Sequence, residues 1–163
     1  MKRLSAVAAL LIGFGAAALA EDATAPPKGS TSLIEVLGDG VQVYSCDATD
    51  HGYAWVFRGP EAALFDAQGR QVGSHGAGPS WKLADGSSVI GEKVAEAASP
   101  DPHAIPWLLL RVKSHDGTGQ LADAAWVRRA NTVGGKAPEA GCDPAHAGET
   151  ARIRYSAVYQ FLR

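Results

Sequence analysis

The sequence has few of the features that mark several large functional classes. Only two cysteines and one methionine occur among 163 residues, and 15 Lys and Arg residues are outnumbered by 17 Asp and Glu residues. The basic residues form no dense cluster, so we predict no nucleic-acid partner. No zinc-type spacing of Cys and His is present, and the Gly-x-Ser-x-Gly and Ser-x-x-Lys hydrolase motifs are absent. The sequence therefore contains no local motif of a common enzyme class.

Long hydrophobic runs are confined to the first twenty residues. The positive start Met1–Arg3 precedes the uncharged segment Leu4–Leu19, which ends in the small-x-small sequence Ala18–Ala20. This pattern predicts a cleaved signal peptide over residues 1–20 and an exported protein, periplasmic or extracellular. The run is too short for a permanent span, so we expect no stable membrane span after processing.

The chain also lacks a usable nucleotide-binding motif. Its one Gly-x-Gly-x-x-Ala match, which runs from Gly13 to Ala18, lies inside the predicted signal peptide. A dinucleotide fingerprint requires a preceding strand and a following helix. We therefore predict no cofactor and reject a dehydrogenase activity.

The two cysteines, Cys46 and Cys142, both follow the predicted cleavage site. In an oxidising compartment two lone cysteines most simply form one disulfide. The bridge would tie the first strong strand to the segment before the last one. A redox pair or a pair of metal ligands is the alternative, which the lack of a Cys-x-x-Cys motif disfavours.

Patterning after the signal peptide predicts an all-β protein. Residues 21–32 are rich in Pro, Gly and Ser and predict a flexible leader. We expect residues 33–163 to form a single β domain. Aromatic residues occupy every second position at 53–57, in a strand that Pro60 should end, and apolar residues do so at 153–161. Residues 88–97 contain good helix formers but no helical stripe, so we predict a strand there. We expect eight or nine strands in a β-sandwich or small β-barrel with one disulfide.

Five residues are candidates for ligand binding. His75 and His115 lie in glycine-rich segments, which let a ligand approach the backbone closely. Trp81 follows a Gly-Pro-Ser loop and could serve as a stacking platform in an open cleft. Arg128 and Asn131 lie near a predicted strand end, where a guanidinium suits a carboxylate or phosphate. Because Arg129 adjoins Arg128 in that strand, only one of the two can line a given pocket.

Each candidate also has a purely structural interpretation. The histidines can cap turns, the tryptophan can pack in the core, and the arginine can pair with a surface carboxylate. We therefore prefer a non-catalytic β domain that binds a small molecule, a glycan or an envelope component. The alternative is a metal-assisted hydrolase that uses His75 and His115, with Asp66 or Asp116 orienting an imidazole.

Several runs taken together resemble one known family; they are residues 40–46, 53–62, 64–69, 78–81, 104–109, 131–138 and 141–142. The combination is similar to the exported family of bacteria and fungi catalogued as domain of unknown function 3455, from about Leu33 to Phe161. The resemblance implies one domain and supplies no catalytic residues, because the family has no established activity. Some members bear a malate-dehydrogenase label, which does not suit a chain without a nucleotide fingerprint or a βα pattern.

Overall fold

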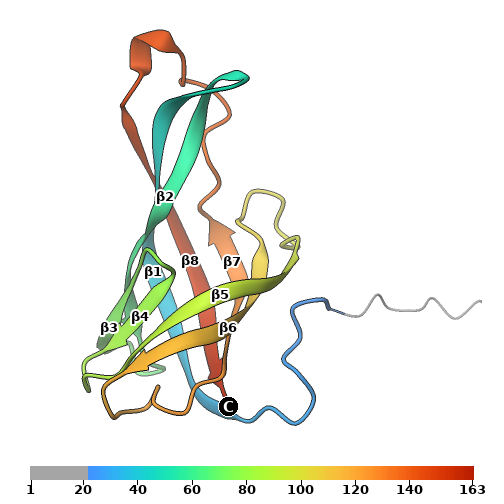
Figure 1. The fold of residues 1–163 in the computed structure, drawn as a ribbon, viewed down its shortest axis with the longest axis vertical. Helices are drawn as coiled ribbons and strands as arrows, with labels where there is room; N and C mark the ends of the chain where they lie inside the picture. The colour runs from blue at the N-terminus through green and yellow to red at the C-terminus, as the bar shows by residue number, and fades with distance from the viewer. Residues whose placement is uncertain (1–21) are drawn as a thin grey trace, which may run out of the picture.

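Eight antiparallel strands form one sheet that closes into a barrel in this computed structural model, which describes residues 22–163 (Figure 1). The predicted signal peptide lies outside the described residues. The strands are β1 (Ser32–Thr49), β2 (Gly52–Phe65), β3 (Gln71–Gly76), β4 (Ser80–Leu83), β5 (Ser88–Ala97), β6 (Trp107–Asp116), β7 (Trp126–Gly134) and β8 (Thr150–Leu162), with a short 3-10 helix η1 (Pro144–His146) before β8. Over the described range, no helix has the length and apolar character needed to cross a membrane.

The barrel is a simple meander. Each strand pairs with the next one along the chain, and β8 pairs with β1 to close the sheet. All connections therefore lie at one end of the barrel or the other. One end carries the β1–β2 hairpin, the β3–β4 turn and the β5–β6 and β7–β8 connections. At the opposite end β1 begins and β8 ends. The predicted all-β class is confirmed, with a barrel of eight strands.

One strand boundary differs from the one expected. Pro60 does not end β2, which continues to Phe65. Its pairing with β3 begins only at Ala62, so on that side no ladder bond requires the missing N–H of the proline. Strand β7 begins at Trp126, and residues 122–125 precede it outside any strand. The hydrogen bond from Ala124 N to Leu121 O closes a turn in this stretch. The ambiguous stretch 88–97 is strand β5, as predicted.

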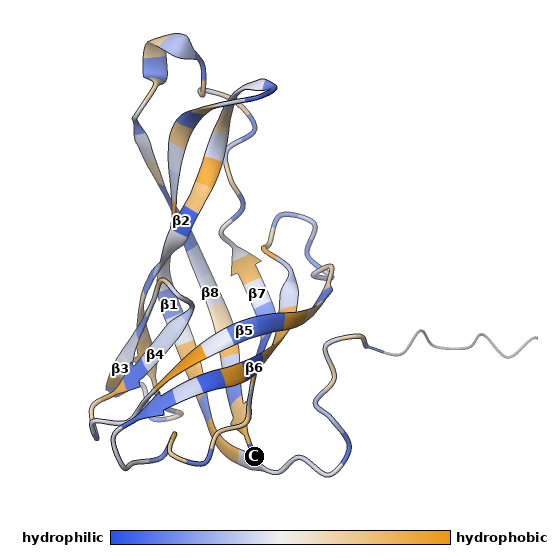
Figure 2. Cartoon of the chain, viewed as in Figure 1, coloured by the Kyte–Doolittle hydropathy of each residue, from blue (hydrophilic) through white to orange (hydrophobic). Residues whose placement is uncertain are grey.

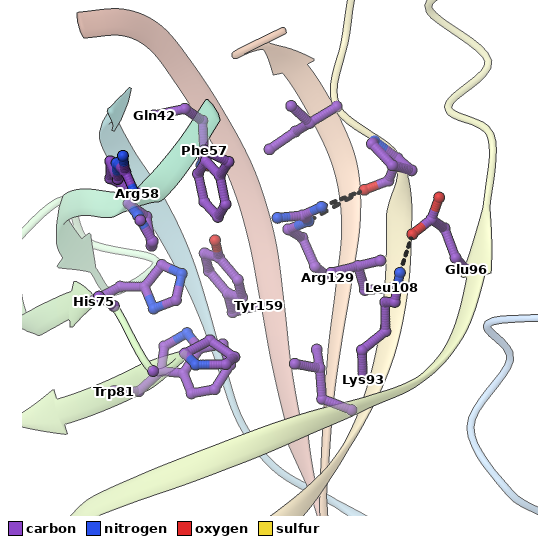
Figure 3. Close-up of a pocket in the computed structure, with 18 of the residues that line it drawn as sticks. Gln42, Phe57, Arg58, His75, Trp81, Lys93, Glu96, Leu108, Arg129 and Tyr159 are labelled. Carbon is purple, nitrogen blue, oxygen red and sulfur yellow. Dashed lines mark hydrogen bonds and ion pairs between the residues drawn. The ribbon is translucent and has the colours of Figure 1, made fainter. Parts of the chain in front are cut away.

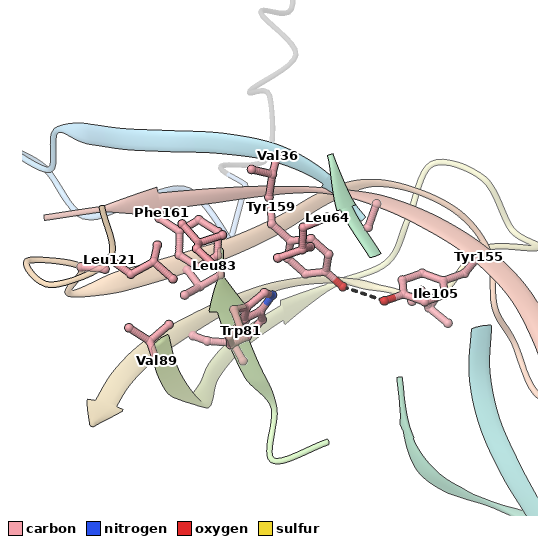
Figure 4. Packing of buried hydrophobic residues seen from close by; sticks show 14 residues of the cluster. Val36, Leu64, Trp81, Leu83, Val89, Ile105, Leu121, Tyr155, Tyr159 and Phe161 are labelled. Carbon is pink, nitrogen blue, oxygen red and sulfur yellow. Dashed lines mark hydrogen bonds between the residues drawn. The ribbon is translucent and has the colours of Figure 1, made fainter. Parts of the chain in front are cut away.

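The hydrophobic core fills the end of the barrel at which β1 begins and β8 ends. Inward-facing side chains alternate along β8, where Tyr155, Ala157, Tyr159 and Phe161 are all buried. Figure 2 shows hydrophobic and hydrophilic residues following one another along β5 and β6. Phe161 packs edge-on against Trp81, with ring centroids 6.0 Å apart. Leu121, from the β6–β7 connection, is completely buried and completes this end (Figure 4). The apolar packing thus closes one end of the barrel and leaves the other end to its loops.

The open end is braced by the Cys46–Cys142 disulfide, whose pairing was predicted. Cys46 lies within β1 and not in a turn, whereas Cys142 lies in the connection between β7 and β8. The β1–β2 hairpin projects beyond the other strands, and the β7–β8 connection runs beside it (Figure 1). Trp55 adds a second link, since its Nε1 donates to the Ala140 carbonyl at 3.0 Å.

Of the predicted flexible leader 21–32, residues 22–31 form no strand but contact the barrel, and Ser32 begins β1. Asp22 accepts a hydrogen bond from Arg128 Nη2 at 2.5 Å, and Thr24 is completely buried. Thr24 also donates to Asp22 through its backbone N and its hydroxyl. These contacts place the segment on the outer face of β7.

Candidate ligand-binding cavity

A cavity of about 470 Å³ occupies the end of the barrel that the core does not fill. This volume lies in the range of small-molecule sites. All eight strands contribute to its walls. The lining side chains are Gln42, Tyr44, Phe57, Arg58, Pro60, His75, Ala77, Pro79, Trp81, Lys93, Glu96, Ile105, Pro106, Leu108, Leu110, Arg129 and Tyr159, with the glycines 59 and 78 (Figure 3).

Two stacked aromatic rings form one wall of the cavity. His75 on β3 and Trp81 on β4 are direct cross-strand partners, and their ring centroids lie 4.5 Å apart at an interplanar angle of 8°. Tyr159 from β8 packs against both rings, 4.9 Å from the centroid of His75. These contacts are possible because directly opposed residues on paired strands face the same side of the sheet.

His75 is uncharged at neutral pH, and one of its ring nitrogens is engaged in a hydrogen bond. Its Nδ1 lies 2.8 Å from the Ser80 carbonyl oxygen, so the proton is on Nδ1, where it can be donated. Burial lowers the pKa of His75 to about 4, partly offset by that hydrogen bond. At neutral pH the imidazole therefore carries no charge, and its Nε2 is an acceptor.

Arg129 is the charged group of the opposite wall. It faces the interior between its cross-strand partners Leu108 and Tyr159. Its Nε and Nη2 both donate to the Pro106 carbonyl, at 3.1 and 2.8 Å. No carboxylate within residues 22–163 forms a salt bridge with this guanidinium, although the side chain is half-buried.

The hydroxyl groups near Arg129 are held protonated. Burial raises the pKa of Tyr159 and of Tyr44, and the positive charge of Arg129 opposes that rise in both. The hydroxyls of Tyr159 and Tyr155 lie 3.1 Å apart, and Tyr44 donates to the Gly135 carbonyl at 2.7 Å. The single proton of Tyr44 is used by Gly135, so the hydroxyl that the cavity wall can offer beside the guanidinium is that of Tyr159.

The other cations of the wall are neutralised. Arg58 is paired with Asp47 at the rim, and Lys93 donates to Glu96 at 2.7 Å. Glu96 is the wall's own carboxylate, and that contact occupies it. Arg129 is thus the cation of the wall whose charge has no counterpart in the part of the chain that the structure describes.

The structure brings two of the five predicted ligand residues together. His75 and Trp81 share the cavity, but Trp81 is only 1% exposed and is not the open platform that we expected. His115 is exposed at the end of β6 and lines a separate hollow, with its Nε2 2.7 Å from the Ala124 carbonyl. Strands β4 and β5 lie between β3, which carries His75, and β6, which carries His115. Because neighbouring strands are about 4.8 Å apart, the structure does not bring the two histidines to one point.

The acidic residues considered for a metal site do not join either histidine. Asp66 lies in the β2–β3 turn, where its carboxylate accepts hydrogen bonds from the backbone of Gln68 and Arg70. Asp116 ends β6 opposite Ser88. Across residues 22–163, no three His, Cys, Asp or Glu side chains converge as a metal-binding group.

Arg128 and Asn131 lie away from the cavity. Arg128 faces outward, where it contacts Asp22 and Gln160 and lies over the Trp107 ring at 5.4 Å. Asn131 is exposed with φ of 49°, at the point where the β7–β8 register shifts. Asn tolerates this left-handed conformation better than most residues, so the backbone explains its presence.

Sequence reasoning missed most of the wall residues, among them Arg129, Tyr159 and Gln42. The one available indication was that only one of the adjacent arginines can face inward, and the structure puts Arg129 there. The alternation of β8 did place Tyr159 with the apolar face. Neither pattern could show that these residues face a cavity and not a filled core.

Comparison with known proteins identifies a family and no characterised relative. A family model described as "Protein of unknown function (DUF3455)" matches residues 26–163. No curated protein shows significant similarity to the chain, and no solved structure does.

Proposed function

The chain belongs to this family of proteins of unknown function, and from its geometry we propose that it is an exported, non-catalytic protein that binds one small, largely apolar molecule in the barrel cavity. The observation that carries the proposal is that the barrel interior is divided between a packed core and a cavity. Eight-stranded barrels have an interior just wide enough to be filled by side chains or to hold one small ligand. Here the core fills one end, and about 470 Å³ remains at the other.

The chemistry of the wall favours binding over catalysis. His75 is neutral, its Nδ1 contacts a carbonyl, and no hydrogen bond joins its ring to a carboxylate or hydroxyl side chain among the described residues. The hydrolase alternative would need His75 and His115 at one metal ion, with ligand distances near ~2 Å. The two histidines line separate hollows, which weighs against that alternative.

An exported location belongs to the same proposal. The disulfide between Cys46 and Cys142 is compatible with an oxidising compartment. The predicted signal peptide at residues 1–20 points to the same destination.

The proposal is tested with a neutral fluorescent probe, N-phenyl-1-naphthylamine, titrated into the oxidised protein. We expect saturable binding of one probe molecule per chain. Ala77→Trp places a large ring at the cavity mouth, where the alanine is exposed, and should weaken binding by about tenfold or more. Ala67→Trp is the matched control, because Ala67 is exposed in the β2–β3 turn at the other end of the barrel.

Thermal melts monitored by circular dichroism check that both variants fold. No saturable binding to the wild type would refute the proposal. Equal binding to the two variants would show that the probe occupies some other surface, which would also refute it.

A further inference from the structure

We propose that the ligand carries a carboxylate group, which is bound by the guanidinium of Arg129 together with the hydroxyl of Tyr159. This inference rests on the proposed function and specifies the chemical class of the ligand. Four features of the cavity support it, namely an unmatched charge, free donors, a buried amide without a partner and an apolar remainder.

The first feature is the unmatched charge of Arg129. A charge removed from water is costly unless it is paired. Elsewhere this chain pairs its arginines with carboxylates, as at Arg152 with Glu61 and Arg154 with Asp39, even though these side chains are exposed. Arg129 is less exposed than either, and its guanidinium donates to the Pro106 carbonyl with no carboxylate paired to it in the described chain. An anionic ligand would supply the missing partner.

The second feature is the direction of the free donors. The contact with Pro106 uses Nε and Nη2 of Arg129, so the N–H groups of Nη1 remain available in the planar fork. Figure 3 shows the guanidinium pointing across the cavity toward the hydroxyl of Tyr159. When the Tyr155 hydroxyl donates to Tyr159, the Tyr159 proton is free for a ligand. A carboxylate between the two groups would receive one bond from each.

The third feature is a buried amide without a hydrogen-bond partner. Gln42, which lines the same cavity, is 2% exposed, and its Nε2 has no hydrogen-bond partner among the described residues. The wall's carboxylate, Glu96, is engaged by Lys93. The polar groups near Arg129 therefore favour a ligand that accepts hydrogen bonds over one that carries a positive charge.

The fourth feature is the apolar remainder of the wall. The stacked rings of His75 and Trp81, the rim residue Phe57 and the side chains of Leu108 and Leu110 face the same space. Such a surface suits a flat ring or a short hydrocarbon chain. The ligand class is therefore an amphiphilic monocarboxylate.

The test compares ligands of one shape and different charge. At about pH 7.5, 2-naphthoate and its neutral isostere 2-naphthamide compete with N-phenyl-1-naphthylamine for the wild-type protein. We expect the carboxylate to bind about tenfold more tightly than the amide, because a charge-assisted pair replaces a neutral hydrogen bond. The preference should shrink as salt is added.

Arg129→Met should remove the preference and retain binding of the neutral probe, which shows that the cavity is intact. Arg128→Met is the matched control, since this neighbour faces outward, and it should keep the preference. Tyr159→Phe removes only the hydroxyl and should reduce the preference about threefold. It also keeps the proposal testable if Arg129→Met does not fold.

The outcomes separate the two proposals. Equal affinity for naphthoate and naphthamide, with the neutral probe still bound, would overturn the carboxylate assignment and leave the proposed function standing. Tighter binding of 2-naphthalenesulfonate or 2-naphthyl phosphate would overturn it in favour of another oxyanion. Failure of the neutral probe to bind the wild type would overturn the proposed function itself.

Discussion

His75 couples the cavity wall to pH. Burial lowers its pKa to about 4 from an ordinary value of 6.5. Between these values the unfolded chain binds a proton that the folded chain does not. The stabilising contribution of the neutral imidazole is therefore complete above about pH 6.5 and is lost as the pH falls toward 4. In this window we expect the free energy of unfolding to fall by up to about 1.4 kcal/mol per pH unit.

The His75 prediction is measured by urea denaturation of the wild type and of His75→Phe at several pH values between 4 and 7. The phenyl ring can keep the stack on Trp81 but cannot titrate, so the variant should lack this part of the slope. His146, whose exposed ring has a raised pKa beside Asp143, contributes with the opposite sign to both proteins and cancels in the difference. Parallel curves for the two proteins would contradict the argument.

At the scale of elements, the β6–β7 connection closes the end of the barrel opposite the cavity. Asp85, in the β4–β5 turn, holds it by accepting a hydrogen bond from Gln120 N at 2.8 Å. Asp85 also accepts from the hydroxyl of Ser87 at 2.6 Å, and the Ser87 oxygen in turn accepts from Leu121 N at 3.2 Å. The bonds to the Asp85 carboxylate lower its pKa to about 2. Their contribution is therefore present above about pH 3.8 and is lost as the pH falls through about 2.

Replacing Asp85 with alanine should release the connection and loosen Leu121 in the core. We expect a loss of about 1–3 kcal/mol in the free energy of unfolding at neutral pH, because charged acceptor bonds are lost. Amide hydrogen exchange at Gln120 and Leu121 should also become faster. Asp50→Ala, in the exposed β1–β2 turn, is the control and should leave both measurements unchanged. Unaltered exchange in Asp85→Ala would show that another contact holds the connection.

At the scale of the whole molecule, the disulfide joins residues 96 positions apart and ties β1 to the β7–β8 connection. Closing a loop of that size stabilises mainly by restricting the unfolded chain. We expect the Cys46→Ser, Cys142→Ser double variant to lose roughly 2–5 kcal/mol in the free energy of unfolding. A reducing agent should destabilise the wild type by a similar amount and leave the double variant unaffected. Equal stability with and without the bridge would contradict this account.

Local patterns predicted most of the architecture. Alternation along β2 and β8 shows a strand directly, since the side-chain period of two is a property of each segment alone. The disulfide was predictable because the chain has only two cysteines to pair. Pro60 misled the boundary of β2, because its effect depends on whether a neighbouring strand needs its N–H at that position.

The cavity could not be predicted in the same way, because it depends on pairing between distant segments. Cross-strand register makes His75 and Trp81 stack, while the two strands between β3 and β6 put His115 in another hollow. Whether Arg128 or Arg129 faces inward is decided by the register of β7 against β6 and β8. A shift of one residue would exchange them.

The sequence by itself thus determined the all-β class, most of the strands and the single disulfide, because each depends on local alternation or on the identity of the only two cysteines. Only the tertiary structure decided that the sheet closes into a barrel, that its core fills one end, and that Arg129 faces the space left at the other. The reason is physical. Closure and filling depend on the stagger of all eight strands together, and no single segment encodes that stagger.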